Sequence, residues 1–177
     1  SKEIKVKNKY KKGIITDSFL TSLIRLSSKE NGPLLAQKFL QENGIVLVIE
    51  PHFQKTYLDG VALLIEDDRP VIGMTLRHDR LDNFWFTLLH ELAHIRLHSN
   101  SGISIFYDEL NEKDSSVLDI KEKEADRLAQ SIILPDSKWE ISPARLIPSL
   151  LAAEGLAKEI GVHPAIIAGQ IRYRGNN

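Results

Sequence analysis

The sequence contains no cysteine, and this absence excludes three kinds of chemistry at once. Disulfide bonds, thiolate metal sites and cysteine nucleophiles are all ruled out. A chain without disulfides fits a reducing compartment, so we expect a cytoplasmic protein. Any metal ion that this chain binds must be held by histidine and carboxylate side chains.

Long apolar runs and an excess of one charge sign are lacking too. No segment approaches the roughly 20 apolar residues that span a bilayer, and the lysine-rich start is not followed by the apolar part of a secretory signal. We therefore expect no membrane association. The net charge is −1, which argues against general nucleic-acid binding.

The length and composition are those of one globular domain. The 177 residues are 42% hydrophobic and 27% charged, which is ordinary for a chain with its own core. Six lysines crowd the first twelve positions, and we interpret residues 1–13 as a solvated basic arm. Residues 14–177 are expected to form a single domain, with 142–177 as a helical C-terminal subregion.

The apolar pattern along the chain predicts an α+β fold. Two amphipathic helices come first, one capped by Thr16 or Asp17 and one that ends at Asn43-Gly44. Three short apolar segments, separated by turn residues, then predict strands. They cover residues 45–49, 61–65 and 71–76. We expect a small, mostly antiparallel three-stranded sheet in which the last two strands form a hairpin.

The rest of the chain is predicted to be mainly helical. A helix that is apolar nearly all round ends at about His98, and we expect it to be central. A second long helix is predicted from about Leu118 to Leu134. Residues 99–116 between them are polar and irregular. From Ser142 onward, further helices form the C-terminal region.

The predicted central helix carries the pattern His-Glu-x-x-His at His90, Glu91 and His94. Two imidazoles at positions i and i+4 lie on one helix face and can bind one Zn²⁺. The carboxylate of Glu91 then reaches the attacking water instead of the metal, and can act as general base. An unligated pair of imidazoles would be costly to bury in this apolar helix, which favours a metal site.

A catalytic zinc ion needs a third protein ligand. Position 100 is Asn, which excludes the metzincin arrangement, and His98 lies too far along the helix to share a metal with both other histidines. At about 100° per residue, Glu122 faces the apolar side of its predicted helix and Glu124 the opposite side. We therefore predict Glu122 as the third ligand. Asp126, four residues later, can hydrogen-bond the free ring nitrogen of a ligand histidine.

Two sequence motifs resemble those of a known family. HELAH at 90–94 is followed about 28 residues later by E-x-E-A-D-x-L-A-x-x-x-x-L-P, from Glu122 to Pro135. Together they resemble the ImmA/IrrE family of metallopeptidases. The resemblance extends over roughly residues 30–175.

The resemblance implies an activity and a class of partner. It implies a gluzincin-like site with His90, His94 and Glu122 as ligands and Glu91 as base. We expect one Zn²⁺ per chain, with Mn²⁺ as the alternative metal. Members commonly act inside prokaryotic cells on helix-turn-helix repressors. We therefore expect a zinc endopeptidase that cuts such a repressor or an antitoxin partner. No helix-turn-helix domain is evident before residue 13, so we expect either a stand-alone peptidase or a piece of a longer protein.

Two other functions fit the same residues. One is an antitoxin-like binding module that retains the zinc fold with little or no proteolysis. The other is a small-molecule amidohydrolase with the same zinc site. The intact Glu91 favours the peptidase, because a binding module has no need of a base beside the metal.

Some residues remain without an assigned role. Peptide hydrolysis also needs a group that stabilises the oxyanion, and spacing does not rank the candidates. They are His78, Arg80, Tyr107 and His163. The last two predicted helices, joined by a short turn, have the pattern of a helix-turn-helix. A DNA reader needs basic residues at the start of the second helix, but Arg172 and Arg174 lie at its end. We therefore expect this region to serve in packing or partner docking. Residues 99–116 are expected to rim the cleft and select the substrate.

Overall fold

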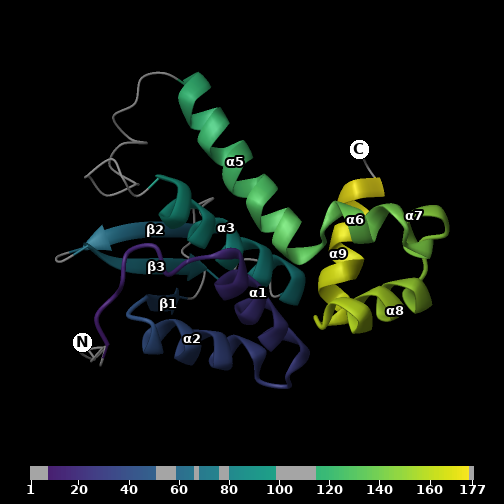
Figure 1. Ribbon diagram of the computed structural model, residues 1–177, viewed down its shortest axis with the longest axis horizontal. Helices are drawn as coiled ribbons and strands as arrows, with labels where there is room; N and C mark the ends of the chain where they lie inside the picture. The colour runs from purple at the N-terminus through teal and green to yellow at the C-terminus, as the bar shows by residue number, and fades with distance from the viewer. Residues whose placement is uncertain (1–7, 51–58, 66–67, 76–79, 99–114, 176–177) are drawn as a thin grey trace.

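A three-stranded sheet and two long helices form the central part of the molecule (Figure 1). The computed structural model describes residues 8–50, 59–65, 68–75, 80–98 and 115–175. The helices are α1 (Asp17–Arg25), the 3-10 helix η1 (Leu26–Ser28), α2 (Gly32–Glu42), α3 (Leu81–His98), α5 (Ser115–Ile133), α6 (Asp136–Glu140), α7 (Pro143–Leu146), α8 (Leu150–Ile160) and α9 (Pro164–Gly175). The strands are β1 (Val46–Glu50), β2 (Gly60–Ile65) and β3 (Arg69–Thr75).

The first two helices begin and end at residues that the sequence marks. The Thr16 side chain accepts a hydrogen bond from the Phe19 amide at 3.2 Å, so Thr16 rather than Asp17 caps α1. After α2, Gly44 takes a φ of 78°, in the left-handed region. A Cβ atom at position 44 would lie 2.3 Å from the Tyr10 nitrogen, so only glycine fits this turn.

The α+β class is confirmed, but the sheet is mixed, which corrects the expectation of a mostly antiparallel sheet. The strand order is β1-β3-β2. β2 and β3 pair antiparallel, with Val61 opposite Gly73, and this confirms the predicted hairpin. β1 pairs with β3 in parallel, with Val46 opposite Val71. β3 lies between the other two strands and runs opposite to β2. β1 also runs opposite to β2, so its pairing with β3 is parallel.

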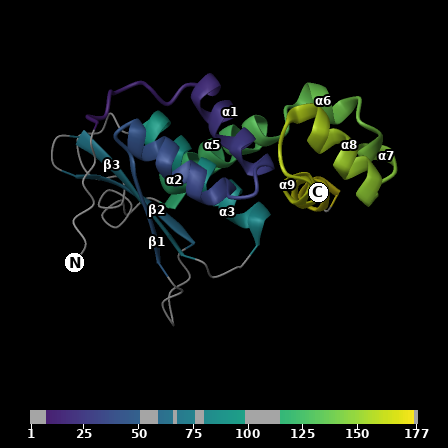
Figure 2. The same ribbon diagram turned by 90° about the horizontal axis from the view of Figure 1, so that it is seen from below.

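Helix α3 occupies the centre, as its apolar character predicted. It packs against β2 and β3 of the sheet and against α1, α5 and α9 (Figure 2). Trp85, Leu88 and Leu92 of α3 are fully buried. One cluster of buried hydrophobic residues extends from Ile15 to Ile171, so the C-terminal helices share the core of the sheet and α3.

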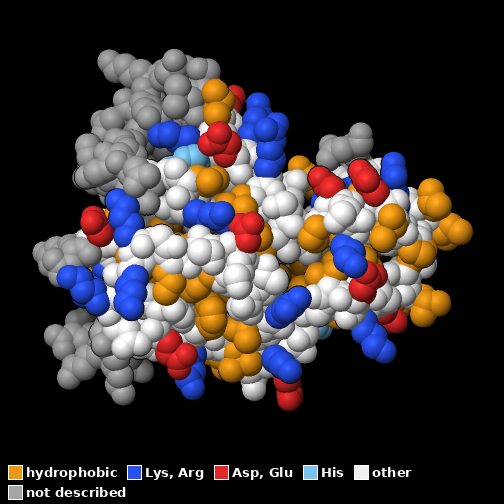
Figure 3. Space-filling view, in the orientation of Figure 1, with side chains coloured by type: hydrophobic (Ala, Val, Ile, Leu, Met, Phe, Trp, Pro, Cys, Tyr) orange, Lys and Arg blue, Asp and Glu red, His pale blue; other side chains and the backbone are white. Residues whose placement is uncertain are grey.

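Helices α6 to α9 gather at the end of the molecule away from the sheet (Figures 1 and 2). Ser142 and Ser149 cap α7 and α8, since their hydroxyls accept from the amides of Ala144 and Ala152. Orange side chains over α7 and α8 mark an apolar patch on the surface (Figure 3). Five aliphatic residues of this region are more than 70% exposed, namely Ile141, Leu146, Ile147, Leu150 and Leu151.

Helix α5 begins at Ser115, earlier than the predicted Leu118. Most of the expected irregular segment, residues 99–114, lies outside the described residues, as do residues 1–7 of the basic arm. Within the described ranges, no helix is long and apolar enough to cross a bilayer.

Replacing Leu88 by alanine tests the central place of α3. Leu88 is 0% exposed, so we expect Leu88→Ala to lower the free energy of unfolding by about 2 to 5 kcal/mol, because the lost side chain leaves a cavity. Urea denaturation followed by circular dichroism measures the change. Leu97, on the same helix but 41% exposed, provides the control Leu97→Ala, for which we expect a loss below about 1 kcal/mol. Equal losses would contradict a core centred on α3.

Candidate metal centre

The two histidines of the pattern lie on successive turns of α3. Their ring centroids are 4.6 Å apart, and their Nε2 atoms are 2.9 Å apart. His94 is buried, and His90 is partly exposed. The i and i+4 spacing has therefore placed both rings on one face, as predicted.

Glu122 of α5 lies against this histidine pair. Its Oε2 atom is 3.1 Å from His90 Nε2, and its Oε1 atom is 3.2 Å from His94 Nε2. Among the described residues, these three form the group whose donor atoms lie close enough to share one metal ion. A tetrahedral zinc ion with bonds of about 2.0 to 2.1 Å holds neighbouring donor atoms about 3.3 Å apart. The three side chains therefore fit a zinc ion.

Asp126 fixes the orientation of His90. The Nδ1–H group of His90 donates a hydrogen bond to Asp126 Oδ1 at 2.9 Å. This leaves a lone pair on Nε2 of His90, which points toward His94 and Glu122. The carboxylate of Glu122 also offers only lone pairs. Acceptors that converge in this way require a cation among them, either a proton or a metal ion.

The ionisation of the cluster agrees with a site for a cation. Burial lowers the pKa of His90, but hydrogen bonds with Asp126 and Glu122 and the charge of Glu91 outweigh burial and raise the pKa to about 10. Hydrogen bonds from His90 and His94 hold the pKa of Glu122 well below its usual range. Without a metal, the cluster therefore holds a proton at neutral pH that a metal ion must displace.

The two glutamates of α5 differ in the direction of their side chains, not in their burial. The side chains of Glu122 and Glu124 are 50% and 52% exposed. Glu122 contacts both histidines of the cluster, whereas Glu124 lies 3.9 Å from Nε2 of His98. His98 is one turn beyond His94 and does not belong to the three-residue group. The helix-angle argument thus pointed to the glutamate that faces the histidines.

Glu91 lies on the side of α3 that faces the sheet. It is 7% exposed, and Gly60, the first residue of β2, lies against it. A Cβ atom at position 60 would be 2.5 Å from Glu91 Oε1 and 2.7 Å from Cγ2 of Thr87. The backbone of β2 is therefore one wall of the space around this carboxylate. The sequence showed Asp59-Gly60 only as a turn, so it gave no signal for this contact.

The four candidates for stabilising the oxyanion lie in different parts of the chain. Arg80 is paired with Asp82. His163 accepts a hydrogen bond at Nδ1 from the Ala165 amide at 3.1 Å, which caps the start of α9. His78 and Tyr107 lie outside the described residues.

The two C-terminal arginines form ion pairs within the chain. Arg172 binds Asp82 at 2.9 Å, and Arg174 binds Asp136 at 2.9 Å. Arg174 also donates to the Leu134 carbonyl at 2.8 Å. These contacts join α9 to the start of α3 and to the end of α5.

A comparison with protein families finds one match that includes the whole cluster. Residues 41–171 match the family model of peptidase M78, which is described as an IrrE N-terminal-like domain. The matched residues include the sheet, α3, α5 and most of the C-terminal helices. No curated protein matches the chain.

Metal analysis of two variants tests the ligand set. We expect about one zinc ion per chain in the wild type by inductively coupled plasma mass spectrometry. Glu122→Gln should weaken zinc binding by more than about tenfold in competition with a chelator, because it removes a charged donor. Glu124→Gln, an equally exposed neighbour, should bind zinc as the wild type does. Wild-type zinc affinity in Glu122→Gln would show that Glu122 is no ligand.

The raised pKa of His90 predicts how zinc binding depends on pH. Since His90 holds its proton below a pKa of about 10 and a ligand imidazole must be neutral, zinc binding should release about one proton per chain at neutral pH. The affinity should then rise about tenfold with each pH unit below that pKa. Calorimetry in buffers of different ionisation enthalpy counts the protons. Zinc binding without proton release would contradict the charge state described above.

Proposed function

The chain belongs to the peptidase M78 family, and from this membership we propose that it is a zinc-dependent endopeptidase. The observation that carries the proposal is the convergence of His90, His94 and Glu122, with Glu91 on the same helix as the two histidines. Two imidazoles and one carboxylate are the donors of a catalytic zinc site that keeps a fourth position open. The two nitrogen donors disfavour Ca²⁺ and Mg²⁺, which prefer oxygen ligands, and suit Zn²⁺. Mn²⁺, which a carboxylate ligand suits, is the alternative metal of the proposal.

The residues of the site have separate tasks in the proposed reaction. A zinc ion held there would polarise the scissile carbonyl and make a water molecule more acidic. Glu91 takes a proton from the attacking water and passes it to the leaving amine. Asp126 keeps His90 in the tautomer whose Nε2 lone pair faces the cluster.

The position of β2 supports a peptide substrate over a small amide. In the part of the chain that the structure describes, β2 has a strand neighbour on its β3 side only. Its first residue, Gly60, lies against Glu91. An extended peptide can pair with such an edge through backbone hydrogen bonds. This pairing would bring a substrate backbone next to the base.

The proposal extends to the partner and the compartment. As the family resemblance implies, the proposed substrate is a helix-turn-helix repressor or an antitoxin partner, cut in an exposed segment. Such partners act in the cytoplasm, where we therefore place the reaction. An antitoxin-like binding module is the competing function, because it would use the same fold without needing a base.

Glu91→Gln separates these two functions. We expect the variant to bind zinc as the wild type does, because Glu91 is not one of the three grouped residues. Its cleavage rate should fall by about 100-fold to 10,000-fold, the usual contribution of a general base. The assay incubates zinc-loaded protein with helix-turn-helix proteins encoded beside its gene and detects fragments by mass spectrometry.

The matched control is Glu140→Gln, which changes an exposed glutamate on α6. It should cleave at the wild-type rate. A wild-type protein that is loaded with zinc and binds such a partner, but leaves it uncut, would contradict the peptidase and support the binding module.

A further inference from the structure

The apolar patch over α7 and α8 consists of side chains that the fold leaves in solvent (Figure 3). On α8, the buried residues Ala153, Leu156 and Ala157 lie on one face. At about 100° per residue, Leu151 points to the opposite face, and it is 78% exposed. A helix with apolar residues on two faces needs a second partner besides the core of its own chain.

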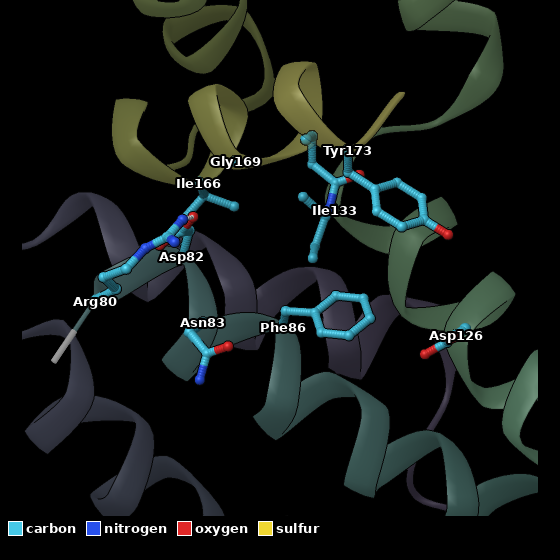
Figure 4. A pocket seen from close by; sticks show the side chains of 10 residues that line it. Arg80, Asp82, Asn83, Phe86, Asp126, Ile133, Ile166, Gly169 and Tyr173 are labelled. Atoms are coloured by element: carbon cyan, nitrogen blue, oxygen red, sulfur yellow. Dashed lines mark hydrogen bonds and ion pairs between the residues drawn. The ribbon is translucent and has the colours of Figure 1, made fainter. Parts of the chain in front are cut away.

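The C-terminal helices use their inner side to pack on the rest of the molecule. α8 packs on α9, and α9 packs on α3. Asp82 of α3 lies beside Gly169 of α9, where a Cβ atom would be 2.6 Å from Asp82 Oδ2 (Figure 4). Arg172 of α9 also binds Asp82, at 2.9 Å. These contacts occupy the inner side of the helices, so the patch on their outer side remains open to another molecule.

The size of the patch matches the apolar part of a dimer interface. At roughly 100 Å² for each exposed side chain, its five aliphatic residues offer on the order of 500 Å² of apolar surface. An interface of standard size buries about 800 Å² on each partner, and homodimer interfaces are about 65% apolar. One copy of the patch therefore supplies the apolar area that such an interface needs.

The charges around the patch are balanced. Four exposed charged residues adjoin it, namely Glu140, Arg145, Glu154 and Lys158. None of the four has an ion-pair partner in the part of the chain that the structure describes. An anionic membrane or a nucleic acid would attract an excess of lysine and arginine, which this surface lacks. A second copy of the same surface instead offers both signs of charge to both signs.

We propose that the patch is the interface of a symmetric homodimer, in which α7 and α8 of one copy pack against the same helices of a second copy. In a two-fold arrangement one surface meets itself, so the five aliphatic side chains of each copy become buried against those of the other. The candidate metal centre lies on α3 and α5, and neither helix contributes a residue to the patch. The dimer therefore forms independently of zinc binding and of cleavage.

The molecular mass in solution tests the dimer. In analytical ultracentrifugation we expect the zinc-loaded wild type to sediment at twice the 20.0 kDa of one chain. Leu151→Glu should weaken dimerisation by more than about 100-fold, because a two-fold interface buries the added charge twice. The matched control is Leu34→Glu, which changes a leucine that is 66% exposed and also lies in the first turn of a helix, but outside the patch. It should dimerise as the wild type does, and thermal melting checks that both variants fold.

A single introduced cysteine locates the interface, because the chain has no cysteine of its own. A short bismaleimide cross-linker should join two copies of Leu151→Cys into a covalent dimer on a denaturing gel. The same reagent should leave Leu34→Cys as single chains. A dimer that is linked through position 34, or that persists unchanged in Leu151→Glu, overturns the assignment of the patch.

A monomeric wild type would overturn the proposal without any variant. Interfaces of this size bind in the micromolar range or more tightly, so a wild type that stays monomeric at about 100 μM has no such interface. Two further measurements on that monomer would then identify the occupant. Binding to phosphatidylglycerol vesicles that is lost in Leu151→Glu would assign the patch to a membrane surface. Binding to a helix-turn-helix protein that is lost in the same variant would assign it to that partner.

Discussion

The packing of α5 along α3 is the contact on which the candidate metal centre depends. α3 supplies both histidines, and α5 supplies Glu122 and Asp126. Ala125 and Ala129 of α5 are buried between these polar positions and the core. Small side chains allow two helices to approach closely. The carboxylates of Glu122 and Asp126 on α5 can then reach the histidines on α3. The site is therefore a product of core packing as much as of the motif itself.

The parts of the site that the sequence predicted are those that local periodicity determines. The spacing of His90 and His94 places two rings on one helix face, whatever the rest of the fold. The angular position of Glu122 relative to its apolar neighbours likewise depends on a single helix. The exposures of the Glu122 and Glu124 side chains are nearly equal, so burial does not distinguish them, whereas the helix angle indicated which of the two faces the histidines.

The parts that the sequence did not predict depend on contacts between distant segments. The parallel pairing of β1 with β3 is decided by which strand takes the central place, and strand periodicity contains no such information. The contact of Gly60 with Glu91 joins β2 of the sheet to α3. Arg172 and Arg174 look like unpaired surface charges in the sequence but form ion pairs with Asp82 and Asp136.

The contact at Gly60 makes the proposed base sensitive to a movement of the sheet backbone. At position 60 the space beside the Glu91 carboxylate is smaller than one methyl group. A compound that pairs along β2 on the side away from β3, and displaces residue 60 toward α3 by a fraction of an ångström, would push the carboxylate out of place. It would leave the three grouped residues untouched. An inhibitor could therefore act on this site without a metal-chelating group. Such an inhibitor would avoid the cross-reaction that chelators show with other metalloenzymes.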